Sequence, residues 1–401
     1  MTKQPTYRFA GYTAPWVEKK LGEVSESFEY GLNASAKEFD GVNKYIRITD
    51  IDDFSNEFLK TNLTSPDVKI DEFSDYLLSE GDILFARTGA STGKTYYYKK
   101  TDGVVFFAGF LIRARIKEDN DHIFIFQNTL TKDFKKYVDI TSQRSGQPGV
   151  NAKEYANFLF SLPSLPEQTA IGSCFQDIDQ LISLQQRKLE VLKEQKKTYL
   201  KLLFPAKGQT KPAFRFAGFE DDWKRKNFGD FLVEFNEKTI VENQHELLSS
   251  TNNGIEPRKG RVSGESNIGY KVLKKDMIVL SPQNLWLGNI NYNVDYESGI
   301  VSPSYKIFNV LDIDKKFISI LIRHPYMNYE YGQASVQGAS VVRRNLDIDL
   351  FNTIQILLPS LEEQTLIGSF FLDLDKAIAK QEEKVKNLKE SKQTLLRKMF
   401  I

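Results

Sequence analysis

The segment of this chain that most resembles a chemical motif is Gly89–Thr95, whose sequence GASTGKT has the glycines, lysine and hydroxyls of a phosphate-binding loop. A Walker loop needs four residues between its glycines, and this segment has three. The residues that follow, Tyr96-Tyr97-Tyr98, predict a strand, whereas a Walker loop opens a helix. The segment is therefore not expected to bind ATP.

Other catalytic patterns are equally incomplete. Ser302-Pro303-Ser304-Tyr305 is close to the loop with which amino-methyltransferases hold an extruded base, but it lacks the second proline, and no glycine-rich loop for S-adenosylmethionine precedes it. No Ser/His/Asp set, HExxH or GxGxxG occurs. Cys174 is the only cysteine and the three histidines lie far apart, so no zinc-ligand spacing exists and no internal disulfide can form.

The composition is that of a soluble globular protein of two or three domains. The chain has 401 residues, of which 41% are hydrophobic and 27% charged, with a net charge of +1. No apolar run reaches the roughly 18 residues of a membrane span, and the first residues lack a signal-peptide core. With one cysteine, a reducing cytoplasmic location is expected.

The elements that must position any functional residues are duplicated. Residues 163–204 and 359–400 align without a gap at an offset of 196 residues, and about half of the positions are identical. Ser164-x-x-Glu167 and Ser360-x-x-Glu363 are capping-box patterns that predict the start of each helix. Phe204-Pro205 ends the first helix, because proline cannot continue the backbone ladder.

Both helices repeat their apolar residues at alternating spacings of four and three, which predicts a coiled coil. Pairing of the two helices within one chain is the simplest arrangement, and a dimerisation coil between chains is the alternative. The predicted seam positions are Ile171, Phe175, Ile178, Ile182, Gln185, Leu189, Leu192, Lys196, Tyr199 and Leu203, and in the second helix Ile367, Phe371, Leu374, Ile378, Gln381, Val385, Leu388, Lys392, Leu395 and Met399.

A second repeat opens each half, where YRFAGYTAPWVEKKLG (7–22) matches FRFAGFEDDWKRKNFG (214–229). Between these anchors the halves are strand-rich and aromatic, with two strands expected in 96–116 and one helix expected in each of 121–138 and 315–331. We therefore predict an α+β fold with a pseudo-twofold arrangement. Its parts are a globular domain (1–160), a spacer helix (161–204), a linker (205–213), a second domain (214–358) and a second spacer helix (359–401).

These paired motifs resemble the specificity subunit of type I restriction-modification systems. The resemblance spans the whole chain and is carried by LPSLPEQTAIG (162–172), LPSLEEQTLIG (358–368), the twin FAG openings and GDILFARTG (81–89). It implies that each globular part is a target recognition domain that reads one half of a bipartite, asymmetric DNA site. The two helices would pack antiparallel as a spacer.

The resemblance also implies that the chain has no catalytic site and binds no cofactor. The methyltransferase and the ATP-dependent endonuclease would be partner subunits, which would hold S-adenosylmethionine, ATP and Mg²⁺. A two-headed coiled-coil adaptor that binds only proteins is the alternative function.

Sequence readout requires Arg, Lys, Asn and Gln at base edges, with Ser, Thr and backbone amides on phosphates. Loops rich in these residues lie at 87–94, 142–153, 281–289 and 332–345, and each could instead be a polar turn. Trp286 could pack on a sugar or belong to the core. The candidate DNA-binding residues are Arg87, Thr88, Ser91, Thr92, Lys94, Gln143, Arg144, Gln147, Asn151, Gln283, Asn284, Gln333, Gln337, Arg343, Arg344 and Asn345.

Several residues recur in both helices away from the seam, either through incomplete divergence or because both copies bind the same partner. The second explanation, taken with the resemblance, suggests two methyltransferase subunits per chain. A seam of roughly 50 Å would separate the half-sites by about one DNA turn of 34–36 Å or a little more. The candidate partner-binding residues are Glu167, Gln168, Asp177, Asp179, Glu363, Gln364, Asp373 and Asp375.

Overall fold

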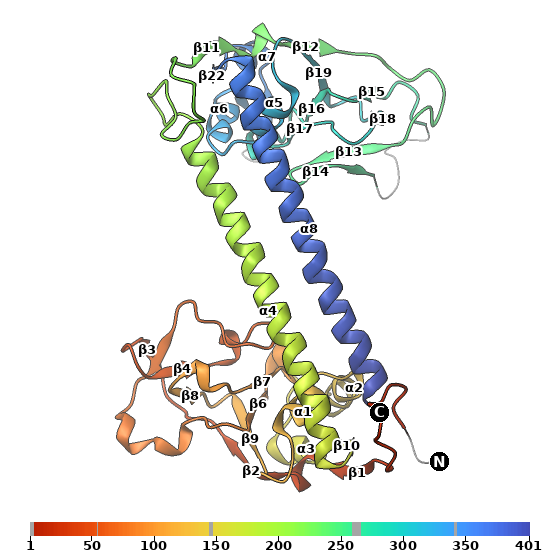
Figure 1. Ribbon diagram of the computed structural model, residues 1–401. Coiled ribbons are helices and arrows are strands. Elements are labelled where there is room, and N and C mark those ends of the chain that lie inside the picture. Colours follow the sequence, from red (N-terminus) through yellow and green to blue (C-terminus); the bar gives the residue numbers. More distant parts are fainter. Residues whose placement is uncertain (1–3, 54, 144–146, 259–265, 341–342) are drawn as a thin grey trace. The chain divides into compact units, whose positions relative to one another are not determined.

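The computed structural model describes residues 4–53, 55–143, 147–258, 266–340 and 343–401, and the side chains among them except those of 337–340 and 343. The chain forms two compact units. Unit 1 comprises Met1–Gln186 and Glu383–Ile401, and unit 2 comprises Arg187–Glu382. Each unit therefore contains one globular domain and a segment of both long helices (Figure 1).

Unit 1 is built on a four-stranded antiparallel sheet in the order β2-β9-β6-β7. Every side chain of β6 is buried, because other elements cover both faces of this strand. Smaller pairs flank the sheet: β1 with β10, β3 with β5, and β4 in parallel with β8. The strands are β1 (Val17–Lys20), β2 (Ser25–Tyr30), β3 (Ala36–Glu38), β4 (Lys44–Ile46), β5 (Thr64–Pro66), β6 (Asp82–Ala86), β7 (Thr95–Tyr97), β8 (Val105–Phe107), β9 (Leu111–Ile116) and β10 (Leu159–Leu162). The helices are α1 (His122–Asn128), α2 (Lys132–Thr141), α3 (Ala152–Ala156) and the first part of α4 (Leu165–Leu202).

Unit 2 repeats this plan with a four-stranded antiparallel sheet in the order β12-β19-β16-β17 and with β11 paired to β22. It adds the pairs β13-β14, β15-β18 and β20-β21. The strands are β11 (Lys224–Asn227), β12 (Leu232–Phe235), β13 (Leu248–Thr251), β14 (Gly254–Pro257), β15 (Lys271–Lys274), β16 (Ile278–Leu280), β17 (Ile290–Tyr292), β18 (Ser298–Val301), β19 (Lys306–Val310), β20 (Ser335–Ser340), β21 (Arg343–Leu346) and β22 (Gln355–Leu358). The helices are α5 (Lys315–Leu321), α6 (Met327–Gln333), α7 (Ile348–Asn352) and the first part of α8 (Leu361–Met399).

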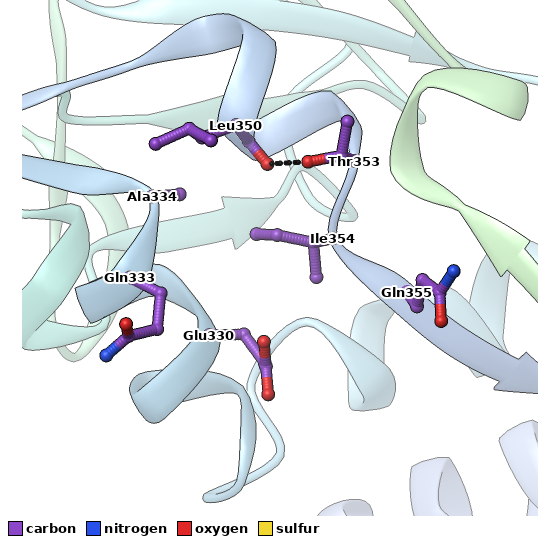
Figure 2. Close-up of a pocket in the computed structure, with 7 residues that line it drawn as sticks. All are labelled: Glu330, Gln333, Ala334, Leu350, Thr353, Ile354 and Gln355. Carbon is purple, nitrogen blue, oxygen red and sulfur yellow. Dashed lines mark hydrogen bonds between the residues drawn. The ribbon is translucent and has the colours of Figure 1, made fainter.

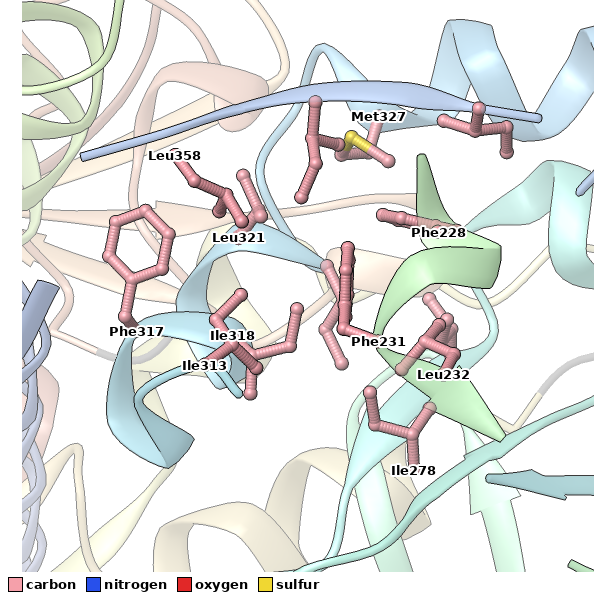
Figure 3. Close-up of a cluster of buried hydrophobic side chains, with 14 of the residues drawn as sticks. Phe228, Phe231, Leu232, Ile278, Ile313, Phe317, Ile318, Leu321, Met327 and Leu358 are labelled. Atoms are coloured by element: carbon pink, nitrogen blue, oxygen red, sulfur yellow. The ribbon is translucent and has the colours of Figure 1, made fainter. Parts of the chain in front are cut away.

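The core of each unit joins its sheet to the long helices. In unit 1, Phe175 of α4 and Phe400 after α8 pack with Phe124 of α1. In unit 2, Phe204 after α4 packs on Phe317 of α5 with ring centroids 5.7 Å apart. Figure 3 shows part of this second core, where aromatic and aliphatic side chains from the sheet and from α5 and α6 interdigitate. Both long helices are therefore anchored in the hydrophobic core of each domain.

The predicted heptad seam is the buried face of both helices, since every seam residue is buried or half-buried. In unit 1, Lys392 Nζ pairs with Asp179 at 2.6 Å, and in unit 2 Lys196 Nζ pairs with Asp375 at 2.5 Å. Tyr199 packs on Phe370 in unit 2. As residue numbers rise along α4 they fall along α8, so the helix segments within each unit pair antiparallel. The coil is formed within one chain.

Three local predictions are wrong. Residues 96–116 form three strands rather than two, because β8 leaves the β7–β9 region to pair with β4. Residues 121–138 and 315–331 each contain two helices rather than one. The Thr131 side chain caps a new helix, α2, and Pro325 lies between α5 and α6, where it cannot continue a helical ladder. The predicted domain borders also differ from the two compact units, which divide both long helices between them.

Candidate nucleic-acid interface

The two polar loops predicted in unit 1 meet in the structure. The β6–β7 loop (87–94) and the α2–α3 loop (142–151) are joined by backbone hydrogen bonds. The amide of Gly89 donates to Pro148 O at 3.0 Å, and the amide of Val150 donates to Arg87 O at 2.9 Å. Segments that lie 48 or more positions apart in sequence therefore form one surface next to the end of β6.

Arg87 lies half-buried at this join. Its guanidinium carbon is 5.0 Å from the centre of the Tyr30 ring, and its Nε is buried without a hydrogen-bond partner among the described residues. The Tyr30 hydroxyl accepts a hydrogen bond from the Ala152 amide of α3 at 3.3 Å. The ring is thus fixed to α3 and holds the arginine in place.

Two candidate DNA-binding residues of the β6–β7 loop, Lys94 and Thr92, make contacts within the chain that stabilise the loop. Lys94 Nζ donates to Ile51 O at 3.0 Å and also pairs with Asp53. The Thr92 hydroxyl donates to Gly89 O at 2.7 Å, which closes the turn. The predicted phosphate contact of Lys94 therefore requires correction, because its ammonium group is already occupied within the chain.

The other unit 1 candidates differ in accessibility. Gln143 and Gln147 are exposed, whereas Thr88 and Ser91 are half-buried. The Asn151 side chain accepts from the Glu154 amide and caps α3, so it has a structural role. Arg144 lies outside the described residues.

In unit 2 the turn that contains Trp286 and the strand that contains Arg344 also come together. The guanidinium carbon of Arg344, on β21, lies 5.1 Å from the centre of the Trp286 ring. Trp286 belongs to the turn η8 (Leu285–Leu287), and its Nε1 is buried without a partner among the described residues. Arg344 Nη1 reaches Gly332 O only at 3.4 Å. Trp286 is therefore half-buried, and its ring supports an arginine rather than belonging fully to the core.

Most of the remaining unit 2 candidates are accessible. Gln283, Asn284, Gln333 and Asn345 are exposed. The side chains of Gln337 and Arg343 lie outside those that the structure describes, although the backbone places Gln337 opposite Arg344 in the β20–β21 pair.

Gln333 also lines an open pocket of about 360 Å³ between α6 and the α7–β22 segment (Figure 2). The Thr353 hydroxyl donates to Leu350 O at its upper edge, at 2.9 Å. The lining contains the carboxylate of Glu330 and two amides but no cationic side chain, so the pocket is unsuited to phosphate. The lining residues are Glu330, Gln333, Ala334, Leu350, Thr353, Ile354 and Gln355.

Glu167 and Glu363 were predicted to contact a partner, but the structure gives them an internal role. Arg8 binds Glu167 through Nε and Nη2 at 2.6 and 2.8 Å, and Arg215 binds Glu363 in the same way at 2.7 and 2.7 Å. Hydrogen bonding by Glu167 raises the pKa of Arg8. Both carboxylates are only 1% exposed and are occupied by an arginine of their own unit, so they are not available at the surface for a partner.

Gln168 and Gln364 require the same correction. The Gln168 side-chain oxygen accepts from the Asp121 amide at 3.0 Å, and Gln364 accepts from the Asp314 amide at 2.9 Å. Asp121 and Asp314 cap α1 and α5, so each glutamine ties the start of a long helix to the start of a domain helix. These buried contacts explain why the residues recur in both halves.

The four aspartates divide into two classes. Asp179 and Asp375 pair with lysines of the opposite helix, as described above, and Asp179 also accepts from Gln127 at 3.0 Å. Asp177 and Asp373 are exposed, and Asp373 lies 3.7 Å from Lys376 on its own helix. Of the eight predicted partner-binding residues, Asp177 and Asp373 are therefore exposed, and Asp179 and Asp375 are half-buried and paired with lysines.

Sequence reasoning missed Tyr30, which supports Arg87. Tyr30 ends β2, more than fifty residues before the arginine, and nothing in its neighbourhood distinguishes it from other strand-end tyrosines. Over the described residues, no cluster of three His, Cys, Asp or Glu side chains suits a metal ion. No helix within the same residues is long and apolar enough to cross a membrane.

Residues 14–194 match the family model for the type I restriction modification DNA specificity domain. The type I restriction enzyme MjaVIII specificity subunit of Methanocaldococcus jannaschii is 25% identical over 380 residues, covering 85% of this chain and 84% of that protein. The putative MjaX specificity subunit of the same organism is 23% identical over 414 residues, covering 95% and 92%.

Two solved structures share the fold. The type I S subunit from M. genitalium gives a TM-score of 0.65 at 14% identity, covering 100% of this chain and 99% of that one. A chain from a study of assembly and conformational transition in the type I R-M system gives 0.54 at 15% identity, covering 98% of each. The family model, the relatives and the fold agree with the duplicated sequence motifs: residues 14–194 match the type I DNA specificity domain, and the chain as a whole is similar to the specificity subunits of type I restriction-modification systems.

Proposed function

We propose that this chain is the DNA-recognition subunit of a type I restriction-modification complex, in which each unit reads one half of a bipartite site. The observation that carries the proposal is the repetition of one framework with different loops. In both units the same sheet order and helix junctions hold a surface where polar segments distant in sequence meet beside an arginine that lies over an aromatic ring. A duplicated frame with divergent reading loops suits a target whose halves differ in sequence.

We propose that the chain itself is a non-catalytic subunit. Gly89 and Gly93 lie in a loop between strands, which lacks the helix that would follow a nucleotide-binding loop. We propose that methylation and cleavage are carried out by partner methyltransferase and endonuclease subunits, which would hold S-adenosylmethionine, ATP and Mg²⁺. The complex would act in the cytoplasm.

We further propose that two methyltransferase subunits bind each chain, one per unit. Leu165 and Leu361 support this proposal, because they occupy matching positions at the start of the two long helices and are 42% and 54% exposed. Asp177 and Asp373 are likewise matched and exposed. Internal packing accounts for the recurrence of Glu167 and its neighbours, but it does not require an exposed leucine at the same place twice.

A salt titration of DNA binding tests the proposed function. The purified chain, alone and with its methyltransferase, is titrated with a duplex at several salt concentrations. Phosphate contacts release counterions, so affinity should fall steeply as salt rises. Because the net charge is only +1, the chain alone should bind weakly and the complex more tightly. Absence of DNA binding in both cases would favour the protein-binding adaptor.

A second experiment tests whether each unit reads its half-site independently. Residues 214–350 are exchanged for the matching segment of a related chain with a different target. The methylated motif should change in one half only. A motif altered in both halves would contradict independent reading by the two units.

A further inference from the structure

Arg87 and Arg344 differ from the other arginines of the described chain. Structural arginines such as Arg8 and Arg215 bind a carboxylate, and Arg113, which lies over Phe107, also pairs with Glu29. Arg87 and Arg344 lie over an aromatic ring and have no carboxylate partner among the described residues. One such arginine is found in each unit.

In unit 1 the backbone of Arg87 is fixed on both sides. Its amide donates to Phe110 O at 3.1 Å, and its carbonyl accepts from the α2–α3 loop. The guanidinium lies 5.0 Å from the Tyr30 ring centre, and its Nε is buried without a partner among the described residues. This arrangement restricts the side chain before any ligand is bound, which lowers the entropic cost of a directed contact.

In unit 2 different residues restrict the Arg344 side chain in a similar way. It lies on β21, and its guanidinium is 5.1 Å from the Trp286 ring centre. Trp286 lies in η8, and a Cβ on the following Gly288 would lie 3.0 Å from Asn328 Oδ1, so α6 runs close beside this turn. The guanidinium makes only a 3.4 Å contact, to Gly332 O, which leaves donors available.

Stacking occupies the face of a guanidinium and leaves the N–H groups at its edge free. A planar fork of donors matches the O6 and N7 acceptors of guanine, and this is the commonest specific contact in the major groove. The same fork can bind a phosphate bidentately, whereas lysine binds phosphate as a point charge, so the experiment below compares base discrimination with overall affinity. The exposed Gln147 and Gln283 lie in the same loop pairs and could contact adjacent bases.

We propose that Arg87 and Arg344 are specificity-determining residues, and that each reads one guanine in the half-site of its own unit. The inference rests on the proposed DNA-recognition function and adds the base that each arginine selects. It requires that each half of the recognised motif contain at least one G·C pair. A mapped half-site without a G·C pair would overturn the assignment for the unit that reads it.

The test uses the complete methyltransferase complex and variants Arg87→Lys and Arg344→Lys, which keep the charge but lose the fork. Binding is measured to duplexes in which each G·C pair of the motif is replaced by A·T. Wild type should lose roughly 5- to 150-fold in affinity at the selected pair. Arg344→Lys should lose this discrimination at one base pair in the half-site of unit 2, with discrimination in the half-site of unit 1 unchanged. Arg87→Lys should lose discrimination at one base pair in the half-site of unit 1 only.

Each variant thus controls for the other, and Arg225→Lys provides an exposed, unstacked arginine in unit 2. Unchanged discrimination in Arg344→Lys would overturn guanine reading. So would an equal loss of affinity for all duplexes, which indicates a phosphate contact. Trp286→Leu retains Arg344 but removes the aromatic ring over which its guanidinium lies. This variant should weaken discrimination at the base pair that Arg344 reads. If the wild-type complex bound no DNA, the proposed function itself would fail instead.

Discussion

At the scale of single residues, the two halves have matching buried side-chain contacts, whereas the exposed polar residues of their loops differ. Arg8 with Glu167 and Arg215 with Glu363 form the same bidentate pair in both units. A carboxylate buried in this way is costly without its partner, so either residue of a pair constrains the other. The recurrence of these residues therefore reflects internal pairing and not a surface for another protein.

Removal of Arg8 should destabilise unit 1 strongly. Arg8→Ala leaves the Glu167 carboxylate buried and unpaired, and we expect a loss of about 3 kcal/mol in the free energy of unfolding. Urea denaturation measures this loss. Adding Glu167→Gln should restore part of it, because the uncompensated charge is removed. Lys19→Ala, which breaks an exposed pair with Glu23, should change stability by less than about 1 kcal/mol. Equal effects of the two alanine variants would contradict the role assigned to Arg8.

His324 should make unit 2 sensitive to mild acid. Its Nε2–H donates to Leu200 O at 3.0 Å, its Nδ1 accepts from the Tyr326 amide, and burial lowers its pKa. The unfolded chain takes up a proton near pH 6.5 while the folded chain resists it. The stabilising contribution is therefore complete above that pH and falls as the pH decreases below it, by at most about 1.4 kcal/mol per pH unit.

The measurement compares urea denaturation of wild type and His324→Gln between pH 7.5 and pH 5. The variant should show a shallower loss of stability below pH 6.5. His245→Gln, a substitution of the other histidine in unit 2, is the control. Parallel pH profiles for wild type and His324→Gln would show that this histidine is not responsible.

At the scale of elements, a close helix junction is repeated in both units. Gly172 of α4 faces the start of α1, and Gly368 of α8 faces the start of α5. A Cβ atom on Gly368 would lie 2.6 Å from Phe317 N and 2.7 Å from Lys316 Cβ. The glycines are thus needed for close approach, although glycine normally weakens a helix.

Gly368→Ala should therefore destabilise unit 2, by about 1–3 kcal/mol from overpacking, despite the higher helix propensity of alanine. Gly332→Ala in α6 is the matched control, since a Cβ there meets no atom within 4 Å. It should be neutral or stabilising by up to about 1 kcal/mol. Thermal unfolding of the two variants distinguishes these signs. Stabilisation by Gly368→Ala would disprove the packing explanation.

At the scale of the whole molecule, we propose that the length of the two long helices sets the separation of the half-sites. Deleting one heptad from both helices keeps the antiparallel register of each pair, such as Lys392 with Asp179. The deletion should shorten the unread spacer of the methylated motif or abolish binding. Methylome mapping in cells that carry the complete system measures the spacer.

Deletion of a heptad from α4 alone is the control for this experiment. It shifts one helix against the other and should break the pairs on one side of the deletion, so loss of the folded protein is expected. An unchanged spacer after the double deletion would refute the idea that the helices act as a ruler.

The sequence by itself determined the duplicated frame, the two long helices and the resemblance to the specificity subunits. Heptad spacing, capping serines and repeated openings are local or periodic signals. The period of an amphipathic helix can be read directly from the spacing of its apolar residues. The seam residues are buried or, like Lys196 and Lys392, half-buried, as their spacing predicted. The polar loops predicted at 87–94 and 281–289 lie between strands, as expected from glycine-rich polar runs, but the loop predicted at 332–345 is wrong, because this segment forms most of β20 and β21.

Only the tertiary structure decided which of these polar residues are free to act. Lys94 is occupied by Asp53, and Glu167 is paired with Arg8, although both resemble available surface charges in sequence. Arg87 and Arg344 gain their aromatic platforms from Tyr30 and Trp286, which lie more than fifty residues away. Such pairings arise when strands and loops distant in sequence are brought together, so the identity of a residue cannot reveal its partner.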